Sequence, residues 1–120
     1  MTATHYLVMD LKFTYAGKAG TDTDDEFDSF TDCALDALSE LERVDPGLND
    51  ADITAALAAR EMSISMRVEA DTLADAIRIF SANVRTALHM VGCHTGGWPV
   101  FKPADGDSLP PARQVDLTDA

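Results

Sequence analysis

The sequence predicts a single α+β domain in which two amphipathic helices cover one face of an antiparallel sheet. Two segments alternate apolar and polar residues with a period of two, which is typical of strands with one face in water. Two others carry apolar residues at every third or fourth position, which is typical of helices packed on one side. The chain has 120 residues, the length of one ordinary domain, and 46% of them are hydrophobic.

The first predicted strand covers residues 6–15. Its odd-numbered positions are all large and apolar, whereas Asp10, Lys12 and Thr14 stand at even positions. We therefore expect the odd set to face the core and the even set to face away from it. Glycines at positions 17 and 20 end the strand.

A helix is predicted to follow. Thr23 and Glu26 form a Thr-x-x-Glu capping box, and the acidic residues around them suit the positive end of the helix dipole. Apolar residues then recur at helical spacing and form one stripe: Phe27, Phe30, Ala34, Leu38 and Leu41. Pro46 and Gly47 end the helix.

Residues 52–69 allow two interpretations over their first half. The stretch 53–59 is rich in alanine and is compatible with a helix, whereas residues 62–69 alternate strictly between apolar and polar. Two strands account for both halves, so we predict a hairpin that turns near residues 59–61. Neither Gly nor Asn marks that turn.

The second helix is predicted to begin at Asp71 or Thr72 and to end at Gly92. A short last strand is predicted at residues 98–101, which completes a folded domain over residues 1–102. Residues 103–120 are polar and contain two adjacent prolines, so we expect a flexible C-terminal tail. Within it, residues 114–117 carry a weak edge-strand pattern.

The predicted order is therefore βαββα, closed by a fourth strand. This order matches the ferredoxin-like plan, in which two helices cover one face of an antiparallel sheet. The resemblance spans residues 4–102 and is one of fold only. It implies no activity, because this fold carries many unrelated functions.

Three residues near the end of the second helix are candidate metal ligands. His89 and Cys93 are four positions apart and can share one side of a helix, and His94 follows directly. Imidazole and thiolate groups together bind zinc or copper. A competing interpretation makes His89 a partner of the helix dipole and Cys93 a buried filler, as we also expect for Cys33. No motif predicts a cofactor.

Charge argues against two classes of partner. The net charge is −12 with only nine Lys and Arg, which disfavours binding to nucleic acid and to anionic membrane surfaces. No apolar run approaches the roughly 18 residues that span a bilayer. The first residues show no secretory pattern, so we expect a cytoplasmic protein with free thiols.

The second face of the sheet gives the functional expectation. It carries small and polar side chains together with Tyr6 and Val8, and one chain leaves it uncovered. We expect a non-enzymatic module, regulatory or ligand-binding, that forms a homodimer through this face. One alternative is a small enzyme of the dimeric ferredoxin-like barrel type, with its pocket between sheet and helices. Another is an acidic adaptor for a basic protein.

Overall fold

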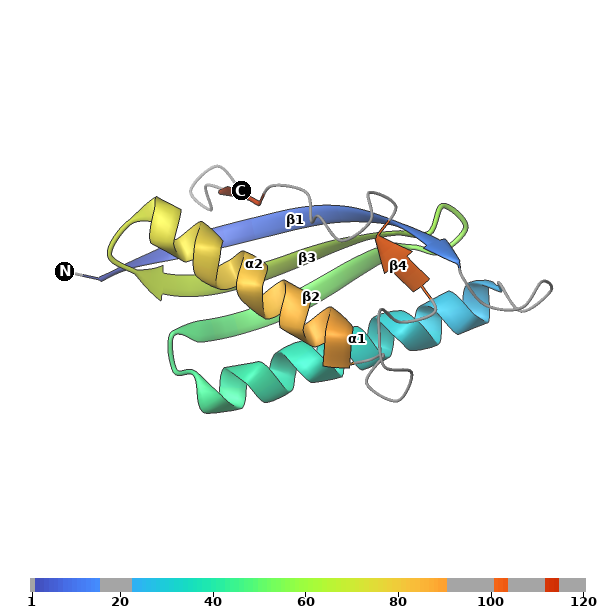
Figure 1. Cartoon of the computed structure of the whole chain (residues 1–120), viewed down its shortest axis with the longest axis horizontal. Coiled ribbons are helices and arrows are strands. Elements are labelled where there is room, and N and C mark those ends of the chain that lie inside the picture. Colours follow the sequence, from blue (N-terminus) through green and yellow to red (C-terminus); the bar gives the residue numbers. More distant parts are fainter. Residues whose placement is uncertain (1, 16–22, 91–100, 104–111, 115–120) are drawn as a thin grey trace.

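The computed structural model describes residues 2–15, 23–90, 101–103 and 112–114. Its elements, shown in Figure 1, are β1 (Ala3–Tyr15), α1 (Asp24–Val44), β2 (Leu48–Ala56), β3 (Glu61–Ala70), α2 (Leu73–Met90), β4 (Phe101–Pro103) and β5 (Arg113–Gln114). None of the helices in these ranges is long and apolar enough to cross a membrane.

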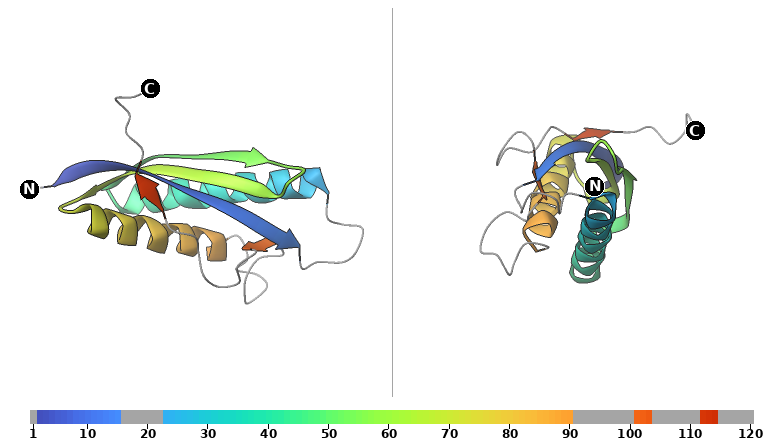
Figure 2. Two further views of the ribbon diagram at one scale, coloured as in Figure 1. Left: turned by 90° about the horizontal axis from the view of Figure 1, so that it is seen from above. Right: turned by 90° about the vertical axis from the view of Figure 1, so that its right-hand side faces the viewer.

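The sheet has the strand order β2-β3-β1-β4, and every pair of neighbours is antiparallel. The long central pair, β1 with β3, runs from Ala3 opposite Ala70 to Lys12 opposite Glu61. Both helices lie on the same side of the sheet (Figure 2). The predicted α+β class and the ferredoxin-like order of elements are thus confirmed.

The alternation along β1 places its side chains as expected. Leu7 and Met9 are completely buried, and Leu11 and Phe13 are 3% exposed. Asp10, at an even position, is exposed on the opposite face. The strand begins three residues earlier than predicted because β3 continues to Ala70 and pairs with those residues.

The start and packing of α1 follow the predicted cap and stripe. The Glu26 N–H donates to Thr23 Oγ1 over 3.2 Å, which satisfies one of the free amide groups of the first turn. Phe27 and Phe30 pack against Phe13, with ring centroids 5.8 and 5.3 Å away. These contacts fix α1 over the end of β1.

The predicted hairpin is confirmed, with its turn at residues 57–60. Arg60 adopts a left-handed backbone with a φ of 54°, the conformation that Gly or Asn usually supplies. Its guanidinium donates to Asp24 Oδ1 over 2.8 Å and lies over the Phe27 ring, 5.6 Å from the centroid. Contacts with the start of α1 therefore stabilise this turn, although its sequence contains neither Gly nor Asn.

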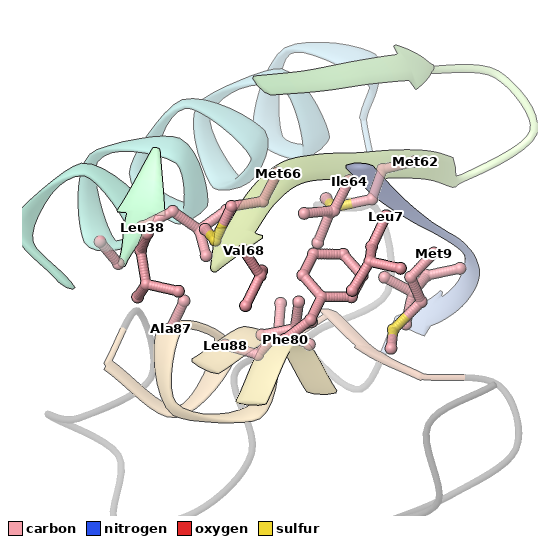
Figure 3. Close-up of a cluster of buried hydrophobic side chains, with 14 of the residues drawn as sticks. Leu7, Met9, Leu38, Met62, Ile64, Met66, Val68, Phe80, Ala87 and Leu88 are labelled. Atoms are coloured by element: carbon pink, nitrogen blue, oxygen red, sulfur yellow. The ribbon is translucent and has the colours of Figure 1, made fainter. Parts of the chain in front are cut away.

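The main core lies between β1, β3 and the two helices (Figure 3). Thr72 caps α2 by accepting from the Asp75 N–H over 3.1 Å. The buried face of α2 consists of Ala76, Phe80, Val84, Ala87 and Leu88.

Two short strands border β1 on the side away from β3. β4 pairs with residues 13–15, and residues 98–100 of the predicted last strand lie outside the described residues. β5, which falls within the segment expected to be a tail, pairs with Leu7 and Val8.

Candidate functional site

The described residues do not test whether the three predicted metal ligands come together. His89 belongs to the last turn of α2, while Cys93 and His94 lie outside the described ranges. The three-residue metal site therefore stays a prediction. Within the described ranges, no three His, Cys, Asp or Glu residues are grouped so that they could hold a metal ion.

Cys33 corrects one expectation about the core. It was expected as a buried filler, but its thiol is free and the residue is exposed. The buried side of α1 passes through Phe30, Ala34 and Ala37, so position 33 points away from the sheet.

The candidate site is the side of the sheet opposite the helices, here called the outer face. In the described part of the chain both helices cover the other side (Figure 2). The outer face consists of side chains from three strands: Thr4, Tyr6, Val8, Asp10 and Lys12 of β1, Glu61, Ser63, Ser65, Arg67 and Glu69 of β3, and Asp52, Thr54 and Ala56 of β2.

The strand register arranges these side chains in rows across the sheet. One row, here called the central row, consists of Asp52, Ser65, Val8 and Arg113, taken in order from β2 to β5. At the end near the hairpin turn, Glu61 and Lys12 stand opposite each other. Each of these rows therefore has an acid toward the β2 side and a base toward the β5 side.

Asp10 connects three strands on this face. The Ser63 hydroxyl donates to its Oδ1 over 2.5 Å, and Arg113 Nη2 donates to its Oδ2 over 3.2 Å. The Ser63 hydrogen bond is the main cause that lowers the pKa of Asp10 below its ordinary value of 3.8. Partial burial opposes this shift, and Arg113 adds to it. The carboxylate is therefore ionised at neutral pH and anchors β5 to the sheet.

Two hollows lie side by side near the hairpin end of the outer face. The larger, about 310 Å³, is lined by residues 10–12 and 61–63, and the smaller, about 150 Å³, by residues 54–56 and 61–63. Their polar lining includes Asp10, Lys12, Glu61 and Ser63. Such neighbouring groups of opposite charge suit contact with a surface that carries charges in the matching positions.

The outer edge of β2 is occupied by carboxylates. Glu42 of α1 accepts from the Ala51 N–H over 2.6 Å, and Asp52 accepts from the Ile53 N–H over 2.9 Å. Asp50 interrupts the regular ladder with a φ of 56°, in the segment where the pairing with β3 shifts register. Together these features discourage another strand from adding to this edge.

Sequence reasoning identified the outer face but not the contacts that organise it. Arg113 lies in the predicted tail, 103 positions from Asp10, and nothing in the local pattern links the two. Glu42 resembles any other acid on an exposed helix. Both roles depend on which strands become neighbours.

Comparison with known proteins gives no family. No protein-family model matches the chain, and no curated protein matches it. The chain is similar to the crystal structure of a hydantoinase/carbamoylase family amidase from Burkholderia ambifaria, with a TM-score of 0.36 and 14% sequence identity. The match covers 98% of this chain and 30% of the amidase chain. A TM-score of this size implies neither a shared fold nor a shared activity.

Proposed function

We propose that this chain is a non-catalytic assembly module that works as a homodimer through its outer face. The observation that carries the proposal is the outer face itself, which combines both signs of charge and lies opposite the two described helices. Antiparallel sheets tolerate water on a polar face, but here Tyr6 and Val8 are half-buried and add apolar surface near its middle.

The blocked edge of β2 supports a contact through the face. A sheet can associate with a second copy either edge to edge or face to face. Two edge N–H groups of β2, those of Ala51 and Ile53, already donate to carboxylates. Edge-to-edge pairing through β2 would require breaking both hydrogen bonds, whereas face-to-face packing leaves them intact.

The distribution of charge supports the same surface. A net charge of −12 opposes self-association, so acids near the contact need bases to meet them. The outer face has Lys12 and Arg67, and Arg113 reaches it from β5. Within one chain, Arg67 Nε lies 3.2 Å from Asp50 Oδ2, and Arg113 Nη2 lies 3.2 Å from Asp10 Oδ2.

A reducing, cytoplasmic location is part of this proposal. The exposed Cys33 thiol is free, which is common in reducing compartments. Within such a dimer the helices stay on the outside, so they remain open to a regulatory partner or ligand.

Sedimentation of the full-length chain at moderate salt tests the proposal. We expect a dimer at micromolar concentration, and we expect Val8→Asp to dissociate it by placing a carboxylate in the contact. Ser39→Asp is the matched control, because it adds the same charge at an exposed position of α1. A monomeric wild-type chain would refute the dimer. A dimer that survives Val8→Asp as well as Ser39→Asp would place the contact away from the sheet.

A further inference from the structure

The rows of the outer face define how two copies can meet. In a face-to-face pair, a two-fold axis can run parallel to the strands, midway between β1 and β3. That axis places β1 of one copy over β3 of the other. Each row of one copy then lies over the same row of the other copy, with the order of its residues reversed. Residues at opposite ends of one row then face each other across the contact.

This arrangement brings opposite charges together. Lys12 and Glu61 share a row, so Lys12 of each copy faces Glu61 of the other. In the central row, Asp52 and Arg113 occupy the two ends and face each other in the same way. Each contact occurs twice, because the axis makes the interface symmetric.

A two-fold axis perpendicular to the strands and passing through the central row gives the opposite result. With that axis through the central row, each strand lies over its own copy in reverse direction. Arg113 would then face Arg113, Asp52 would face Asp52, and Glu61 would face Glu69. Like charges brought together at an interface are strongly unfavourable, so the register favours the parallel axis over a perpendicular axis through the central row.

The dimensions of the face are compatible with a specific contact. Ten paired positions of β1 and β3 make it about 34 Å long, and three strands make it about 14 Å wide. The projected area is therefore about 480 Å², and the relief of the side chains raises the accessible surface toward the roughly 800 Å² per partner of specific interfaces. Packed sheets lie about 10 Å apart and cross at about 30°, so the central row keeps the closest alignment.

We infer that a second copy of this chain docks on the outer face about a two-fold axis parallel to β1 and β3. Lys12 pairs with Glu61 of the second copy, and Asp52 pairs with Arg113 of the second copy. This inference rests on the proposed homodimer and adds its axis and its charge contacts.

Charge reversal followed by mixing tests the axis. Lys12→Glu and Glu61→Lys each place two pairs of like charges in the dimer, and each should weaken dimerisation at least about tenfold. Mixing the two variants creates a heterodimer in which every Lys12–Glu61 contact is complementary again. Native mass spectrometry should then show heterodimers well above the statistical half. Repulsion within each chain is unchanged by mixing, so only a contact between chains explains the rescue.

The control is a second pair of reversals with the same changes in net charge. Arg43→Glu and Glu40→Lys alter an exposed ion pair of 2.9 Å on α1, away from the sheet. We expect dimerisation close to wild type for both variants and no preference on mixing. Circular dichroism and thermal unfolding confirm that all four variants are folded.

The outcomes separate this inference from the proposed function. A wild-type monomer overturns both. A wild-type dimer that tolerates Lys12→Glu and Glu61→Lys as well as the control pair overturns the axis and leaves the homodimer standing. Variants that are weakened but not rescued by mixing also overturn the axis, because the charges then act only within each sheet.

Discussion

Asp10 illustrates how one side chain can organise a surface. Its two oxygens accept from Ser63 of β3 and Arg113 of β5, although the residue itself belongs to β1 and is exposed. Exposed ion pairs contribute little to stability because water screens them. These contacts therefore matter for the position of Arg113 more than for stability. They hold Arg113 at the end of the central row, where the proposed dimer contact requires it.

The first prediction concerns the pKa of Asp10. Because the Ser63 hydrogen bond is the main cause of its lowering, Ser63→Ala should raise the pKa toward 3.8. The hydrogen bond favours folding above the unfolded-state pKa, and this contribution is lost as the pH falls through the lower folded-state pKa. Carboxyl NMR titration measures the shift. Thr54→Ala, in the same row, is the control, and an unchanged pKa in Ser63→Ala would contradict the assignment.

Arg60 gives a second prediction, in which the contributions of its backbone conformation and of its side-chain contacts to stability can be separated. Arg60→Ala loses the Asp24 and Phe27 contacts and keeps a left-handed backbone that costs a residue with Cβ about 1–2 kcal/mol. Arg60→Gly loses the same contacts without that backbone cost. The free energy of unfolding should therefore be lower for Arg60→Ala than for wild type, and lower for Arg60→Ala than for Arg60→Gly. Urea denaturation measures it, and equal stability of the two variants would argue against the left-handed turn.

At the level of secondary structure, β2 is the strand whose environment is least regular. It lies at the edge of the sheet, and α1 reaches it through the carboxylate of Glu42. The register shift between Asn49 and Asp52 interrupts its ladder, while residues 52–56 pair regularly with β3. A long regular edge would attract other chains, and this irregularity together with the carboxylates protects against such pairing.

Removing the carboxylate should expose the edge. Glu42→Ala leaves the Ala51 N–H without its acceptor, so we expect a loss of about 1–3 kcal/mol and concentration-dependent association. Glu42→Gln keeps an acceptor and should remain closer to wild type. Light scattering during incubation measures the association. Glu40→Ala, two residues earlier on an exposed site, should not associate, and equal behaviour of both alanine variants would remove this role from Glu42.

For the molecule as a whole, the core joins both helices to the two central strands. Phe80 of α2 is completely buried and lies with Leu7 of β1 and Ile64 of β3 in one cluster (Figure 3). Because α1 contributes Leu38 to the same cluster, loosening one element should loosen all of them. The described elements should therefore unfold as one cooperative unit.

Phe80→Ala tests this shared core. Removing a large buried aromatic side chain should lower the free energy of unfolding by about 3–5 kcal/mol. Denaturant unfolding followed by circular dichroism gives the value, and hydrogen exchange shows whether β1 and both helices lose protection together. Val44→Ala, at a position that is 79% exposed, should change stability by less than about 0.5 kcal/mol. Loss of protection confined to α2 would contradict a single unit.

The sequence alone was sufficient for the two helices and the three long strands and for the faces that they bury, but not for the short strands β4 and β5. The alternation along β1 and the stripe of α1 are local patterns, and they identified Leu7, Phe13, Phe27 and Leu38 as core residues. Local pattern was misleading for Cys33, which borders the stripe but is exposed, because the position of a helix over a sheet decides what lies at its margins.

Only the tertiary structure decided how distant residues meet on the outer face and at the edge of β2. The contacts of Arg113 with Asp10, Glu42 with Ala51 and Arg60 with Asp24 join residues separated by 103, 9 and 36 positions. Periodicity determines which way a side chain points, whereas such contacts depend on strand order and register, which a local pattern does not encode. The acids and bases of the outer face could be read from the sequence, but their rows exist only once β2, β3, β1 and β5 are paired.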